Sequence, residues 1–158
     1  MWILMTLALG ATALGSDLQL FVDDSLIESM TGATLELHHP QPREIVLEFE
    51  KPWEGPASAY LSVFQDGDKY RCYYRGLPGE KADEVACTAE SADGIHWTKP
   101  ELGIWEVKGA KANNVVWTGQ GSHNFCPFLD ANPAVQLEAK YKAVGGAPLL
   151  GFTSPDGY

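Results

Sequence analysis

Two acidic residues in the first third of the chain are candidates for acid–base or nucleophilic chemistry. Glu54 lies in the stretch WEGP at residues 53–56, directly before an apolar segment at residues 59–65. Trp53 adds an aromatic face beside it. Asp24, at the end of an earlier apolar segment, is the candidate for a second carboxylate. Such a pair can act as acid and base, or as acid and nucleophile; the alternatives are an exposed loop glutamate and a strand-end turn.

Three polar residues are candidates for ligand binding. The guanidinium of Arg75, at the end of segment 69–75, can pair with Glu54 or bind a hydroxyl or carboxylate. His123 and Asn124 open a later apolar segment, where a buried polar group is costly unless it is paired. We therefore expect these two to contact a ligand. The alternatives are a hydrogen bond between repeats for His123 and Asn124, and a surface salt bridge for Arg75.

We expect no metal site and no cofactor. His38 and His39 are adjacent, and neighbouring side chains of a strand point to opposite faces, so the two cannot share one ion.

The segments that must position these residues form an internal repeat with an offset of 63 to 64 residues. Each unit reads as an apolar strand, an Asp-bearing turn, a Lys-Tyr strand, a third strand and a Ser-x-Asp-Gly turn. The first unit contains Val63–Asp66, Lys69–Arg71 and Glu90–Trp97, which correspond to Pro127–Asp130, Lys140–Lys142 and Thr153–Tyr158.

The pattern predicts strands at residues 59–65, 69–75, 84–90 and from 96, with Pro100 limiting the last one. Asp66-Gly67-Asp68 is a hairpin signal. Residues 113–117 form either another strand or the outer edge of this unit. A repeated antiparallel meander of four strands is typical of β-propeller blades. We expect an all-β chain with N-terminal strands in 17–56, a first full repeat in 57–118 and a second repeat in 119–158 that breaks off before its tryptophan.

Together with the repeat and the leader, several stretches resemble the five-bladed β-propeller glycoside hydrolase superfamily, which includes families 32 and 43. The turn Ser91–Trp97 carries this resemblance. Three further stretches are similar to uncharacterised exported bacterial members of planctomycete type: LFVDD at 20–24, KPWEGP at 51–56 and GSHNFCPF at 121–128. The resemblance implies a propeller of which about two of five blades are present, so that the chain is an N-terminal fragment.

The resemblance also implies which polar residues lie at the ligand end of the propeller and which lie at the opposite end. Ligands of this superfamily sit where the inner strands start, which places Glu54, Asp24, Arg75, His123 and Asn124 at the ligand end, with Trp53 as a face for a sugar ring. The opposite end carries turn residues that accept backbone N–H bonds, namely Asp66, Asp68, Asp93, Asp130 and Asp156. The implied function is a glycosidase acting on an oligosaccharide or polysaccharide in the propeller channel. The family 32 motif WMNDPNG is absent, which favours the alternative of a non-catalytic propeller that binds glycans or proteins.

Composition limits the partners and the compartment. The formal net charge of −10 disfavours nucleic acids and anionic membranes. Residues 1–16 are uncharged, too short to span a bilayer, and end in a small-x-small pattern, so we expect a signal peptide and export. Cys72, Cys87 and Cys126 are expected as buried apolar residues; a bridge between the first two is the alternative.

Overall fold

The computed structural model describes residue 20, residues 22–79 and residues 84–158. The chain divides into two compact units, Met1–Pro42 and Arg43–Tyr158. The signal peptide expected at residues 1–16 lies outside the described residues. Strands were expected within 17–56, but residues 22–56 form bends, turns and coil. The backbone hydrogen bonds that this segment does make are local: the N–H of Ile27, for example, donates to the carbonyl of Asp24 at 3.0 Å.

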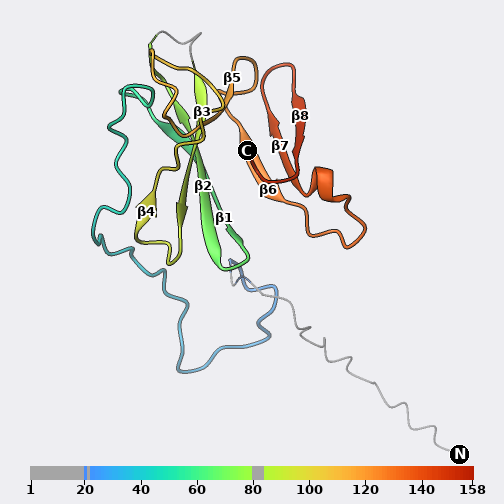
Figure 1. The fold of residues 1–158 in the computed structure, drawn as a ribbon. Coiled ribbons are helices and arrows are strands. Elements are labelled where there is room, and N and C mark those ends of the chain that lie inside the picture. Colours follow the sequence, from blue (N-terminus) through green and yellow to red (C-terminus); the bar gives the residue numbers. More distant parts are fainter. Residues whose placement is uncertain (1–19, 21, 80–83) are drawn as a thin grey trace, which may run out of the picture. The chain divides into compact units, whose positions relative to one another are not determined.

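The larger unit holds two antiparallel sheets (Figure 1). The first has five strands in the order β1-β2-β3-β4, with β5 beside β3. β4 pairs with the end of β3 and β5 with its beginning, so the two short strands share one edge of β3. The segment predicted at 113–117 therefore completes this outer edge. The strand bounds are β1 Ala59–Asp66, β2 Lys69–Gly76, β3 Val85–Ser91, β4 Trp97–Thr98 and β5 Val115–Thr118.

The second sheet repeats the first three strands of this arrangement. It has the order β6-β7-β8, with β6 at Cys126–Leu129, β7 at Tyr141–Gly145 and β8 at Leu150–Ser154. The connection between β6 and β7 is longer than the β1–β2 turn and carries the short 3-10 helix η2, Leu137–Ala139. The strands predicted from the repeat are thus confirmed in both copies.

Local hydrogen bonds explain why the same turn appears twice. The Ser91 hydroxyl accepts the backbone N–H of Gly94 at 2.9 Å. Asp93 Oδ1 accepts the backbone N–H groups of Ile95 and His96. In the second copy the Ser154 hydroxyl accepts the N–H of Gly157 at 3.0 Å, and the Asp156 carboxylate accepts the N–H of Tyr158. Serine and aspartate thus replace backbone partners that the chain lacks where it reverses.

The central strands β2 and β3 of the first sheet are buried on both faces. One face packs Trp53, Cys72, Tyr74, Cys87 and Val115 into a single core. The other packs Tyr73, Ala86 and Val116 against aromatic residues that include Phe125 and Tyr158 from the second repeat. β3 is consequently buried along almost its whole length, so the two repeats share a core.

The structure establishes an all-β fold of antiparallel sheets that do not close into a ring. All three cysteines are free; Cys72 and Cys87 are buried and Cys126 is exposed, which confirms the expectation of buried apolar residues for the first two only. Cys72 lies opposite Ala89 in the sheet, and Cys87 lies opposite Tyr74. The described residues contain no helix that is long and apolar enough to cross a membrane.

Candidate functional site

Four side chains from both repeats meet at the end of the first sheet where β1 begins and β2 ends. They are Tyr60, Arg75, Glu84 and His123. An extra residue in β1, between the positions paired with Arg75 and Tyr73, forms a bulge at Tyr60. Tyr60 has φ 57°, a left-handed backbone that non-glycine residues rarely adopt and that concentrates at functional sites. Bulges re-aim side chains in this way, and here the ring is turned to His123.

His123 and Glu84 form the centre of this cluster. The imidazole Nδ1 lies 2.8 Å from Glu84 Oε1 and 3.0 Å from Oε2. Because a carboxylate only accepts hydrogen bonds, Nδ1 carries the hydrogen atom and donates a hydrogen bond to Glu84. Arg75 Nη1 lies 3.2 Å from the same Nδ1, but a guanidinium only donates, so this approach is a contact and not a second hydrogen bond.

This tautomer leaves the lone pair of His123 Nε2 free to accept. The Tyr60 hydroxyl lies 3.3 Å from Nε2 and donates to it. The two rings are tilted, with centroids 5.1 Å apart. Glu84, His123 and Tyr60 therefore form one hydrogen-bonded chain that ends on an exposed phenol. An oriented imidazole of this kind can take a proton from the hydroxyl, and the carboxylate stabilises the imidazolium that forms.

Arg75 contacts two members of the cluster, Glu84 and Tyr60, and also binds the backbone of Ala57. Its Nη2 donates to the carbonyl of Ala57 at 3.0 Å, and Nη1 lies 3.4 Å from Glu84 Oε1. The guanidinium also lies over the Tyr60 ring, 4.9 Å from its centroid. Its Nε is buried and has no hydrogen-bond partner among the described residues. The ion pair is largely buried, with 13% of the Arg75 side chain and 11% of the Glu84 side chain exposed, so Arg75 fixes both the carboxylate and the phenol.

Glu54, the expected catalytic carboxylate, is buried in the core instead. Its side chain is 0% exposed. Oε1 accepts from Tyr74 Oη at 2.6 Å and from Lys99 Nζ at 2.7 Å, while Oε2 accepts the N–H of Lys51 at 2.8 Å. Burial raises the pKa of Tyr74 well above its usual value, which keeps this phenol protonated and donating. Both oxygens are occupied and out of reach of a substrate, so the catalytic role expected for Glu54 is not supported.

Trp53 belongs to the same buried network. Its indole Nε1 donates to Asn114 Oδ1 at 2.6 Å, and the residue is 9% exposed. Asn114 Nδ2 in turn donates to Tyr74 Oη at 2.8 Å. The ring that was expected to offer a face to a sugar is therefore packed in the core. The expected partner of Glu54, Arg75, pairs with Glu84, and Lys99 takes its place.

Asn124 and Asp24 are the two remaining candidates. Asn124 is exposed, and its Oδ1 accepts the N–H of Gly146 at 2.7 Å, which ties down a loop of the second sheet. Asp24 is exposed in the unit Met1–Pro42, so the structure does not assign it to this site. Within residues 22–79 and 84–158, no group of His, Cys, Asp and Glu side chains is arranged to hold a metal ion.

The turn aspartates differ among themselves. Asp93, Asp130 and Asp156 accept backbone N–H groups, as expected for turn residues. Asp66 is buried, and its Oδ2 accepts from Arg71 Nε and from Tyr141 Oη, each at 2.7 Å. Asp66 thus joins the two repeats.

Two members of the cluster, Tyr60 and Glu84, were not anticipated. The repeat itself contains a signal for Tyr60, because the offset of 64 makes Ala59 and Tyr60 equivalent to His123 and Asn124, and the two equivalent pairs meet through Tyr60 and His123. Glu84 carries no such signal: it directly precedes β3, and its role depends on His123 reaching it from the second repeat. Comparison of the chain with protein-family models, curated proteins and solved structures finds no match. The fold and this geometry therefore define an all-β protein with an oriented histidine at a sheet end.

Proposed function

We propose that the protein is an exported glycoside hydrolase or related carbohydrate-active enzyme with its site at Tyr60, Glu84 and His123. The observation that carries this proposal is the hydrogen-bonded chain from Glu84 through His123 to the Tyr60 hydroxyl. It supplies a group that can give or take a proton at an exposed position. The half-exposed ring of Tyr60 also offers an apolar face on which a sugar can lie.

A β-propeller remains the architecture that we propose for this function. Equivalent first strands of the two repeats lie beside each other: Tyr60 approaches His123, and Ser62 Oγ lies 3.5 Å from Cys126 Sγ, 64 residues later. Blades arranged around an axis bring their inner strands together in this way. A ligand channel would then be lined by the starts of β1 and β6.

A non-catalytic propeller that binds glycans or proteins is the second candidate, and one observation favours it. Most glycosidases use two carboxylates that flank the scissile bond. The cluster provides one, Glu84, because the carboxylate of Glu54 is enclosed in the core.

The test compares two histidines that both pair with a carboxylate. Full-length protein is assayed for release of reducing ends from a panel of plant and algal polysaccharides, and for binding to the same panel. His123→Gln should lower turnover at least a hundredfold, because it removes the proton-transfer group. His96→Gln is the matched control, since His96 pairs with Asp93 in an exposed turn, and it should leave turnover unchanged. Glycan binding without hydrolysis would favour the second candidate, and neither binding nor hydrolysis would refute both.

A further inference from the structure

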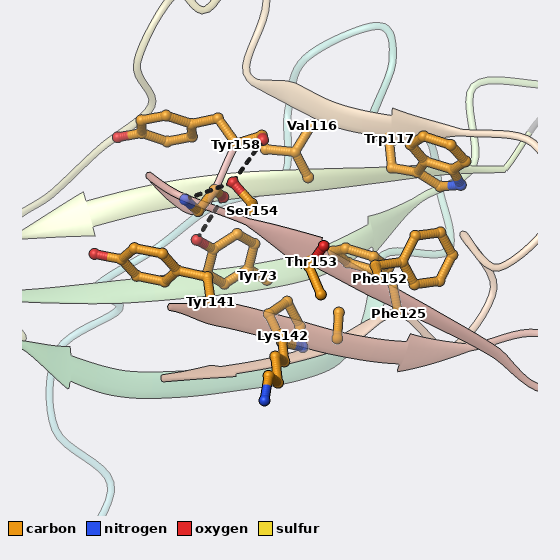
Figure 2. Close-up of a pocket in the computed structure, with 13 residues that line it drawn as sticks. Tyr73, Val116, Trp117, Phe125, Tyr141, Lys142, Phe152, Thr153, Ser154 and Tyr158 are labelled. Carbon is orange, nitrogen blue, oxygen red and sulfur yellow. Dashed lines mark hydrogen bonds between the residues drawn. The ribbon is translucent and has the colours of Figure 1, made fainter. Parts of the chain in front are cut away.

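A cavity between the two sheets is separate from the proposed site (Figure 2). Its volume is about 150 Å³. The first sheet contributes Tyr73, Val116 and Trp117, and the second repeat contributes Phe125, Phe152 and Tyr158. The space is partly open to solvent, so a small molecule can enter it from outside.

The walls of the cavity are aromatic edges and faces. The ring of Phe152 meets Trp117 and Phe125 edge to face, with both centroid distances at 5.2 Å. Trp117 is itself oriented, because its indole Nε1 donates to the carbonyl of Gln120 at 2.9 Å. Aromatic rings prefer such tilted arrangements at about 4.5–7 Å. A further flat ring placed among these three can adopt the same geometry.

Most of the polar side chains at the cavity are already paired with the protein. Tyr73 Oη donates to the carbonyl of Gly157 at 2.8 Å, and the Ser154 hydroxyl bonds to the backbone of Gly157 and Tyr158 (Figure 2). Lys142 Nζ, whose residue also lines the cavity, is bound to Asp130. An occupant therefore receives mainly apolar contacts, and the Thr153 hydroxyl is the polar side-chain group of the lining that can still bond to it. A ring with several hydroxyl groups, such as a sugar, would lose most of its bonds to water without replacement.

We infer that this cavity binds one small, uncharged, monocyclic aromatic group. Size supports the assignment, because a space of about 150 Å³ is large enough for benzene. The lining supports it as well, since the rings that surround the space are those that recognise another ring. This inference does not rest on the proposed function and does not involve Tyr60, Glu84 or His123.

The first test uses full-length protein and benzene, followed through the indole N–H resonances of the tryptophans. Trp117 lines the cavity, whereas Trp53 is held by Asn114 in the other core. Benzene should shift the Trp117 signal to saturation and leave the Trp53 signal in place. Methyl α-glucopyranoside, a larger ring that carries several hydroxyl groups, should shift neither. A saturable Trp117 shift with the glucoside, or none with benzene, would overturn the inference.

A filled variant adds a second measurement. Ala143 lies opposite Phe152 in the sheet and lines the cavity, so Ala143→Leu places extra methyl groups in the space. Benzene affinity should fall at least tenfold. Val144→Leu, at an exposed neighbouring position, is the matched control and should bind benzene as the wild type does. Equal affinity in all three proteins would place the benzene elsewhere and refute the site; if Ala143→Leu fails to fold, the tryptophan signals of the wild type decide.

Discussion

The hydroxyl of Tyr73, in β2, donates to the carbonyl of Gly157, 84 residues later, at 2.8 Å. This bond joins the first sheet to the Ser-x-Asp-Gly turn of the second repeat. Arg71 lies beside it, with its guanidinium between the rings of Tyr141 and Tyr158 at 5.0 and 4.7 Å from their centroids. The turn is therefore a contact between repeats as well as a chain reversal.

Gly157→Ala should weaken this contact more than backbone strain alone explains. Gly157 has φ +86°, and an added Cβ would lie 2.7 Å from Arg71 Nη1 and 2.8 Å from Tyr73 Oη. Arg71 cannot move away easily, because Asp66 holds its Nε at 2.7 Å. Forced overpacking of this kind costs about 1–3 kcal/mol. Urea denaturation measures the loss in the free energy of unfolding.

Gly109→Ala is the control for the backbone term. Gly109 has φ +74°, but nothing lies within 4 Å of an added Cβ. Its substitution should therefore cost about 1 kcal/mol or slightly more. Equal losses at the two glycines would show that the close approach of Gly157 to Arg71 and Tyr73 does not contribute.

The buried Asp66 should make the contact between repeats sensitive to acid. Burial acts to raise the pKa of Asp66, but hydrogen bonds from Tyr141 and Arg71 outweigh it and hold the pKa below its ordinary value. A lowered folded-state pKa stabilises the native state above the unfolded pKa, near about 3.9. This stabilisation is lost as the pH falls from about 4 toward the folded pKa.

Urea denaturation at a series of pH values measures this effect. Asp66→Asn should be less stable at neutral pH and should lose less further stability between about pH 4 and pH 2 than the wild type. Asp68→Asn, at an exposed position of the same hairpin turn, should follow the wild-type curve. An unchanged acid slope in Asp66→Asn would contradict the role of this carboxylate.

Thiol reactivity should separate the three cysteines. Cys72 and Cys87 are buried and Cys126 is exposed. Burial raises the pKa of Cys72 to about 11, and it raises the pKa of Cys87 further. Only the thiolate reacts, so one thiol per chain should react with Ellman's reagent at pH 8 in native protein, and three in urea. Cys126→Ser should abolish the native reaction; rapid native labelling of two thiols would contradict the buried placement.

The strands could be predicted because short-range chemistry determines them. Gly67 at the β1–β2 hairpin and the Ser91–Gly94 turn mark chain reversals by their own side chains and backbone, and their repetition sets the register of the second sheet. Residues 22–56 form no strand in the structure, since apolar character alone does not supply a partner strand. Strand pairing needs a neighbour that local sequence does not specify.

The candidate site was predicted in part for the same reason. Arg75 and His123 lie together because both stand near strand ends that the repeat defines. Glu54 points into the core, because its direction depends on Lys99, 45 residues away, and on Tyr74. Glu84 was missed, because its partner His123 belongs to the other repeat. The positions of Glu54 and Glu84 thus depend on contacts between residues that are far apart in the sequence.

The buried position of Glu54 leads to a prediction that distinguishes a structural role from a catalytic one. Lys99 Nζ lies 2.7 Å from Glu54 Oε1, and 14% of the Lys99 side chain is exposed. Glu54→Gln removes the charge that neutralises this ammonium group. Breaking one half of a buried pair costs roughly 3–5 kcal/mol, so Glu54→Gln should lower the free energy of unfolding by about that amount.

A double variant tests whether the loss arises from the unpaired charge. Glu54→Gln combined with Lys99→Met leaves no uncompensated ion, and replacing a whole pair with apolar groups is often close to neutral. The double variant should therefore be more stable than Glu54→Gln alone in urea denaturation. If Glu54 were catalytic instead, Glu54→Gln would abolish turnover without loss of stability, and Lys99→Met would not rescue it.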